Sequence, residues 1–149
     1  MIRVAADRRA VLCVLALLSG GCGKFQQARE CGTFVKTVNA WLASPEAQNA
    51  ADAGASNDPK QVAKSARRTA EHYAELSRRL AALHVQSEEL LPRVQRYEQI
   101  ADSAASTLRE VADALDLGDL EKARQKRIDF DTVAQREPLL VNEINGLCR

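Results

Sequence analysis

Residues 90–115, LLPRVQRYEQIADSAASTLREVADAL, decide the fold class of this chain. Apolar side chains recur there at alternating steps of four and three residues, which is the pattern of one face of an α-helix. We expect Ser87 to cap this helix, Pro92 to lie near its first turn or to kink it slightly, and Gly118 to end it. The predicted core-facing residues are Leu90, Val94, Tyr97, Ala101, Ala104, Leu108, Val111 and Leu115.

Two segments upstream show the same helical period. The first covers residues 25–43, and the second begins with Asp58 as N-cap and Pro59 at the first helical position. The stretch near residues 45–58 between them lacks large apolar side chains and is typical of a solvated linker. The predicted core positions are Ala28, Cys31, Phe34, Val35, Val38, Trp41 and Leu42 in the first segment and Val62, Ala66, Thr69, Tyr73, Leu76, Leu80 and Leu83 in the second.

A fourth helix is expected after Gly118, with Asp119 as its N-cap and a kink at Pro138. Four helices joined by one longer and two short connections predict an all-α fold, a small antiparallel bundle that spans residues 25–149. A hydrophobic share of 46% with only 4% aromatics agrees with a helix-rich domain. The residues that we expect the fourth helix to bury are Phe130, Val133, Leu140, Ile144 and Leu147.

The N-terminal segment has the layout of an export signal. Three arginines lie within residues 3–9, and residues 10–18 then read AVLCVLALL without a charge. A membrane-spanning helix needs about 20 apolar residues, so this run is too short to be one and fits a signal-peptide core. Small residues fill positions 19–21, and Cys22 follows. At this point the chain resembles a bacterial lipoprotein precursor.

The resemblance implies that residues 1–21 are removed and that acyl chains on Cys22 anchor the protein in a membrane, with residues 22–24 as anchor and short tether. In diderm bacteria an Asp after the lipidated Cys retains the protein at the inner membrane. The Gly23 found here therefore favours the outer membrane, facing the periplasm. Leu18 stands one place further from the Cys than in the usual lipobox, and the alternative is an ordinary secretory peptide with a free Cys22 thiol.

Processing also changes the charge balance. The whole chain has a formal net charge of +1, which lacks the basic surplus of proteins that bind nucleic acid. Removal of residues 1–21 takes away three arginines and one aspartate, which leaves 18 basic and 19 acidic residues and a charge of −1. Such a domain is not drawn to anionic lipid by its overall charge, so we expect the acyl chains to do the anchoring.

The cysteines agree with export. Cys13 belongs to the signal and Cys22 to the anchor, which leaves Cys31 and Cys148 near opposite ends of the mature chain. In an up-down-up-down bundle these two positions lie at the same end, and an oxidising compartment favours a disulfide between them. The alternatives are two free thiols, or a metal or redox pair.

The catalytic motifs that we looked for are absent from the sequence. There is no GxSxG, HExxH, CxxC or Gly-rich phosphate loop in the mature chain. His72 and His84 are separated by about 120° around a continuous helix, so they cannot share one ligand face. We expect no enzyme activity, no metal and no cofactor.

The second helix carries a basic strip made of Lys60, Lys64, Arg67, Arg68, Arg78 and Arg79. One interpretation is a charged face that complements the acidic residues from Asp102 onward. The other is a surface that meets an acidic partner or an anionic polymer. Together these features predict a non-catalytic structural or protein-interaction lipoprotein of the cell envelope, with a protein partner there. The alternative is a small-ligand-binding helical domain of the sensor type.

Overall fold

The computed structural model describes the backbone of residues 8–45 and 58–149 and the side chains of residues 23–45 and 58–149. The described residues form helices and turns, with no strand among them. The predicted all-α antiparallel bundle is confirmed. Its helices are α1 (Arg8–Leu42), α3 (Pro59–Ala81), α4 (Leu91–Asp116), α5 (Leu120–Ala134) and α6 (Glu137–Leu147).

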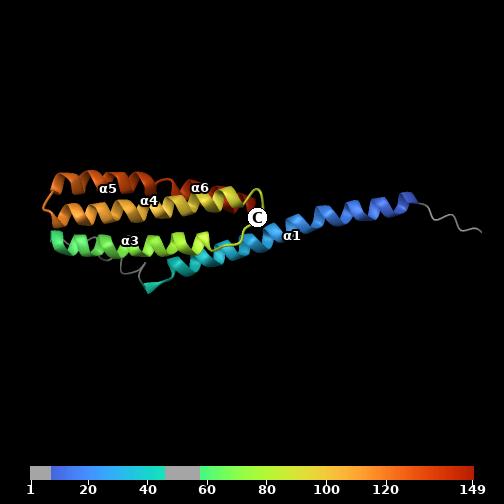
Figure 1. Cartoon of the computed structure of the whole chain (residues 1–149), viewed down its shortest axis with the longest axis horizontal. Helices are drawn as coiled ribbons and strands as arrows, with labels where there is room; N and C mark the ends of the chain where they lie inside the picture. Colours follow the sequence, from blue (N-terminus) through green and yellow to red (C-terminus); the bar gives the residue numbers. More distant parts are fainter. Residues whose placement is uncertain (1–7, 46–57) are drawn as a thin grey trace, which may run out of the picture.

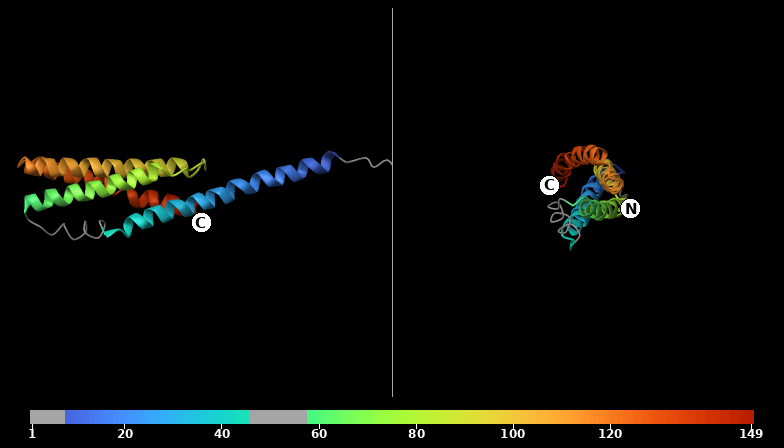
Figure 2. Two further views of the ribbon diagram at one scale, coloured as in Figure 1. Left: turned by 60° about the horizontal axis from the view of Figure 1, so that its bottom comes forward. Right: turned by 90° about the vertical axis from the view of Figure 1, so that its left-hand side faces the viewer.

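The helices form four rods, because α5 and α6 follow one another along the same side of the molecule (Figure 1). Successive rods run in opposite directions, and an end-on view shows them arranged around a common interior (Figure 2). The contact between α3 and α4 is the most extensive, followed by that between α4 and α5, whereas α1 meets α3 over a short stretch only. The N-terminal half of α1 extends beyond the other rods (Figures 1 and 2).

The seam predicted in residues 90–115 forms the centre of the core. Seven of its eight residues are buried, and Leu115 at its end is half-buried. Around Tyr97 the core is built from all four rods, with Phe34 of α1 meeting its ring edge-on at a centroid distance of 5.8 Å. Toward the α4–α5 turn the core is made of alanines, Leu108 and Val111, where α3 and α4 approach closely.

The α1 helix differs from its prediction in length. It begins at Arg8 instead of residue 25, so Gly23 and Lys24 lie within the helix and not in a separate tether. Residues 10–18 are mostly leucine and alanine and contain no proline, which favours a helix. The three glycines that follow, Gly20, Gly21 and Gly23, cost about 1 kcal/mol each inside a helix, and α1 nevertheless continues through them.

The buried face of α1 is narrower than the predicted one. Cys31, Phe34 and Trp41 are buried, as expected. Ala28, Val35 and Leu42 were also predicted in the core, but all three are exposed. Burying a large aromatic ring removes more apolar area from water than burying Ala or Val, so the two rings determine which face turns inward.

The predicted caps are confirmed at two helix starts. The Asp58 carboxylate accepts a hydrogen bond from the backbone N–H of Lys60 at 3.0 Å, and the Asp119 carboxylate accepts one from the N–H of Lys122 at 3.0 Å. Gly118 separates α4 from α5 with φ +73°, a conformation that glycine adopts without a steric penalty. Residues 46–57, which include most of the predicted linker, lie outside the described residues.

Proline sets the remaining helix boundaries. A proline ring clashes with the carbonyl four residues earlier and lacks an N–H, so it is tolerated only in the first turn of a helix. Accordingly α4 begins at Leu91 and has Pro92 in its first turn. Just before this helix, the Ser87 hydroxyl accepts a hydrogen bond from the backbone N–H of Leu90. At Pro138 the expected kink is a full break, and the fourth rod is divided into α5 and α6.

Candidate functional site

The candidate site is the end of the bundle from which α1 projects, because the predicted anchor residue Cys22 lies on that part of α1. The side chain of Cys22 is outside the described residues, but its backbone belongs to the helix. The nine helical residues that lead from Cys22 to Cys31 span about 14 Å at 1.5 Å per residue. The anchor position is therefore one short helical segment away from the core.

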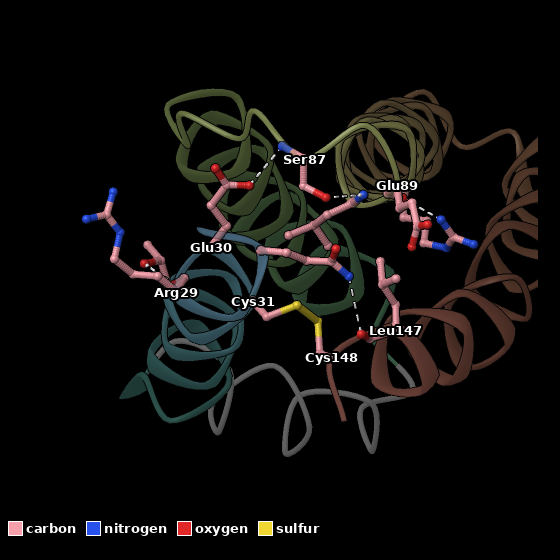
Figure 3. The surroundings of a disulfide bond; sticks show 11 residues. Arg29, Glu30, Cys31, Ser87, Glu89, Leu147 and Cys148 are labelled. Carbon is pink, nitrogen blue, oxygen red and sulfur yellow. Dashed lines mark hydrogen bonds between the residues drawn. A yellow bond between two sulfur atoms is a disulfide. The ribbon is translucent and has the colours of Figure 1, made fainter. Parts of the chain in front are cut away.

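A disulfide joins Cys31 of α1 to Cys148 at the end of α6, as predicted. The two Cα atoms are 5.6 Å apart, and 117 positions separate the cysteines in sequence (Figure 3). Cys31 is buried in the core cluster, and Cys148 packs against it from the edge. Beside the disulfide, the Gln27 side chain donates a hydrogen bond to the carbonyl of Leu147 at 3.5 Å. Both contacts hold α1 against α6.

Glu30 forms the second connection of α1, this time to the α3–α4 loop. Its carboxylate accepts hydrogen bonds from the backbone N–H of Gln86 at 3.1 Å and from that of Ser87 at 3.0 Å (Figure 3). The Gln26 side chain donates a third bond at 2.9 Å, and its amide also contacts the Gln86 side chain. Glu30 is 8% exposed, so a buried carboxylate of α1 binds two consecutive peptide groups of the α3–α4 loop.

The environment of Glu30 favours its charged form. Burial by itself raises the pKa of this carboxyl, but the hydrogen bond from Gln26, those from the two backbone N–H groups and the charge of Arg29 outweigh burial. The net pKa is therefore below its ordinary value. Glu30 was not among the residues predicted from the sequence. The available signal was that residues 23–45 contain no other carboxylate and that Glu30 precedes Cys31 directly.

A small hollow lies on the outer side of this connection. It has a volume of about 100 Å³ and is lined by Arg29, Glu30, Thr33, Leu83, His84 and Val85. Sites for drug-sized ligands usually enclose about 300–1,000 Å³. The hollow is therefore too small to support the ligand-binding alternative.

At the inner end of α1, Trp41 is fixed by contacts with α3. Its indole N–H donates to the carbonyl of His72 at 2.9 Å, and its ring stacks on the His72 imidazole at 4.4 Å between centroids. Tyr73 lies against the same indole at 5.4 Å and against Phe130 of α5 at 6.1 Å. His72 is thus a buried interhelical residue, whereas His84 is exposed in the α3–α4 loop.

The predicted basic strip is divided by its ion pairs. Arg67 pairs with Asp113 at 2.9 Å and Asp116 at 2.6 Å on α4, as the complementary-face interpretation expects. Arg78 and Arg79 both pair with Glu75 on their own helix, at 2.8 Å each. The rest of the strip is exposed and forms no ion pair with a described residue: Lys60, Lys64 and Arg68. These three residues lie in the first half of α3, far from the projecting end of α1 (Figure 1).

Groups of metal ligands and membrane-spanning helices are both absent from the part of the chain with described side chains. His, Cys, Asp and Glu residues form no group of three or more there that could hold a metal ion. None of the described helices combines the length and the apolar character needed to cross a membrane.

Comparison with known proteins adds no relative. No protein-family model matches the chain, and neither the curated proteins nor the solved structures contain a significant match.

Proposed function

We propose that this protein is a membrane-anchored lipoprotein of the cell envelope, held by acyl chains on Cys22, whose bundle acts as a non-catalytic structural or protein-interaction module. The observation that carries the proposal is the continuity of α1. It runs without a break from the segment that holds Cys22 into the core, and the disulfide at Cys31 then joins it to α6. An anchor at Cys22 would thus be connected directly to the folded domain.

This arrangement would define two ends of the bundle. The anchored end, next to Cys22, would contain the α3–α4 loop and Cys148, and the far end would contain the α4–α5 turn and the start of α3. The outer membrane, with the domain facing the periplasm, is the location we propose in a diderm source.

The proposed partner surface lies at the far end, where Lys60, Lys64 and Arg68 are exposed without ion pairs among the described residues. Positive groups that are not neutralised within the domain can steer and orient an acidic partner. We therefore expect an envelope protein with an acidic surface, not a nucleic acid, because the chain has no overall basic surplus.

The anchor is tested by growing cells with a palmitate analogue and measuring its incorporation into the full chain. Wild type and a Cys13→Ser variant should be labelled equally, because Cys13 lies in the segment that we expect to be removed. A Cys22→Ser variant should lose the label and leave the membrane fraction. Equal labelling of the Cys22→Ser variant would refute the assignment of the anchor to this residue.

The partner surface is tested by a photo-crosslinking residue placed at Lys64 in cells, with Gln99 on the exposed side of α4 as a matched control position. A discrete crosslinked protein at position 64 that is absent at position 99 and is lost in a Lys60→Glu, Arg68→Glu background supports the proposal. Equal crosslinking at both positions, or none at 64, would argue against the strip as the partner surface.

A further inference from the structure

The exposed side of α1 carries an apolar stripe. Phe25 is 75% exposed, Val35 38% and Leu42 53%, although all three belong to the helix that enters the core. Together with Ala28 and Gly32 they recur at steps of three, four and seven residues, so they lie along one face of the helix. We call this set of five residues the α1 face. It leaves large side chains in contact with solvent along much of the described part of α1.

The charges that border the α1 face are of one sign. Arg29 and Lys36 flank it on one side, and Lys24 precedes Phe25; all three are exposed. Figure 3 shows Arg29 pointing away from the bundle. The one carboxylate of residues 23–45, Glu30, is buried against the α3–α4 loop and does not reach the exposed side. The near-zero charge of the mature chain thus hides a local basic surface on α1.

An exposed apolar stripe bordered by lysine and arginine is the composition of helices that lie in the plane of a membrane interface. The apolar side chains enter the boundary of the acyl region, and the basic groups contact anionic headgroups. The position of the α1 face agrees with this role, because Phe25 follows Cys22 by three residues on the same helix. The exposed charges on the described part of α1 are all basic, which a membrane of anionic lipids explains and which a protein partner would not require.

We propose that the α1 face lies on the anionic headgroup surface of the bilayer, so that the bundle rests on its side along α1 instead of standing upright on its lipid anchor. The inference rests on the proposed function, which places the bilayer next to Cys22. Each basic residue near an anionic surface contributes roughly a fivefold bias. Lys24 is next to Cys22 and lies close to the bilayer in either orientation, so Arg29 and Lys36 are the residues that favour the lying orientation, together by about 25-fold.

The orientation can be measured by lysine acylation of the full chain, isolated from its native membrane and reconstituted into protein-free vesicles of phosphatidylcholine with or without phosphatidylglycerol. We expect Lys36 to react at least roughly tenfold more slowly in phosphatidylglycerol vesicles than in detergent. Lys64 on α3 should react equally fast in both and serves as the internal control. Protection should weaken in phosphatidylcholine alone and at high salt.

Charge-reversal variants provide a matched comparison. Arg29→Glu should restore the reactivity of Lys36 in phosphatidylglycerol vesicles. Arg68→Glu makes the same change in charge on an exposed position of α3 and should leave Lys36 protected. Restoration by both variants, or by neither, would overturn the proposal.

Flotation and intact mass, recorded on the same samples, separate this inference from the lipid anchor. An acylated chain that floats but leaves Lys36 fully reactive overturns the lying orientation and leaves the anchor intact. A chain without acyl groups that still shows protected Lys36 in phosphatidylglycerol vesicles overturns the anchor and supports the α1 face. Protection in native membranes that is lost in protein-free vesicles would show that a protein, not lipid, covers α1 and would refute the proposal.

Discussion

Replacing Glu30 by Gln tests whether the connection between α1 and the α3–α4 loop is a stabilising feature of the fold. The carboxylate accepts three hydrogen bonds, two of them from the backbone N–H groups of Gln86 and Ser87. A glutamine side chain offers one oxygen acceptor and one NH₂ donor, so one of the backbone donors would then face another donor. The variant keeps the size of the side chain and removes its charge.

The expected cost can be worked from these contacts. A hydrogen bond to a charged group contributes about 1.5–3 kcal/mol, and a buried donor left without an acceptor costs about 1–3 kcal/mol. Glu30 is 8% exposed, but Gln86 is exposed and Ser87 half-buried, so water can partly replace the lost acceptor. We therefore expect Glu30→Gln to lower the free energy of unfolding by about 2 kcal/mol.

Urea denaturation gives this global value, and hydrogen exchange gives a local one. The amide protons of Gln86 and Ser87 should exchange about 30-fold faster in the variant, which is the same 2 kcal/mol expressed as a ratio of opening constants. Glu88→Gln is the matched control, because Glu88 is exposed in the same loop and forms no hydrogen bond with a described residue. Unchanged exchange at Ser87 in the Glu30→Gln variant would refute the stabilising role.

Three further predictions follow from the same packing. The folded state lowers the pKa of Glu30 below its ordinary value of 4.5, so its contribution to stability is complete at neutral pH and is lost as the pH falls through the folded pKa. The difference in free energy of unfolding between wild type and Glu30→Gln should therefore shrink as the pH is lowered below 4.5, and a difference that grows in acid would contradict this. Replacing Cys31 and Cys148 by Ser should lower the free energy of unfolding by about 5 kcal/mol, which is the chain-entropy value for the loop that they close. A loss below about 1 kcal/mol would show that the disulfide does little to restrict the unfolded chain. Trp41→Ala should lower the free energy of unfolding by about 3–5 kcal/mol, whereas Leu42→Ala on the exposed side should lower it by under about 0.5 kcal/mol. Equal losses of stability in urea denaturation would mean that the buried face of α1 is assigned wrongly.

The parts of the fold that could be predicted from the sequence are those fixed by local rules. The alternating spacing in residues 90–115 identified the central helix and seven of the ten side chains buried in this stretch; the three that it missed are the alanines at positions 105, 112 and 114. Asp58, Gly118 and Asp119 marked helix ends because capping depends on residues one to three positions away. The disulfide followed from topology, since antiparallel rods bring the start of the first and the end of the last together.

The inward face of α1 could not be read from spacing alone. Val35 and Leu42 fit the helical period as well as Phe34 and Trp41 do, and the choice between the two faces depends on rings contributed by other helices. Glu30 is a similar case. Its partners are peptide groups 56 and 57 positions away, which no local pattern relates to it. The candidate site was thus predictable at its cysteines and not at the carboxylate beside them.

The placement of the connections of α1 has a mechanical consequence for the proposed anchoring. Among the described side chains of α1, the hydrogen bonds and the disulfide that join it to the rest of the bundle come from residues 26–31, apart from the Trp41 hydrogen bond. Because α1 meets α3 over a short stretch only, a force applied at an anchored Cys22 would otherwise separate the two helices turn by turn. The disulfide and Glu30 would instead pass that force to the end of α6 and to the α3–α4 loop. In a domain that lies on its α1 face, the force would act across α1, and the disulfide and the Glu30 hydrogen bonds would still hold α1 to the bundle. The same contacts would therefore stabilise the lying and the upright orientation.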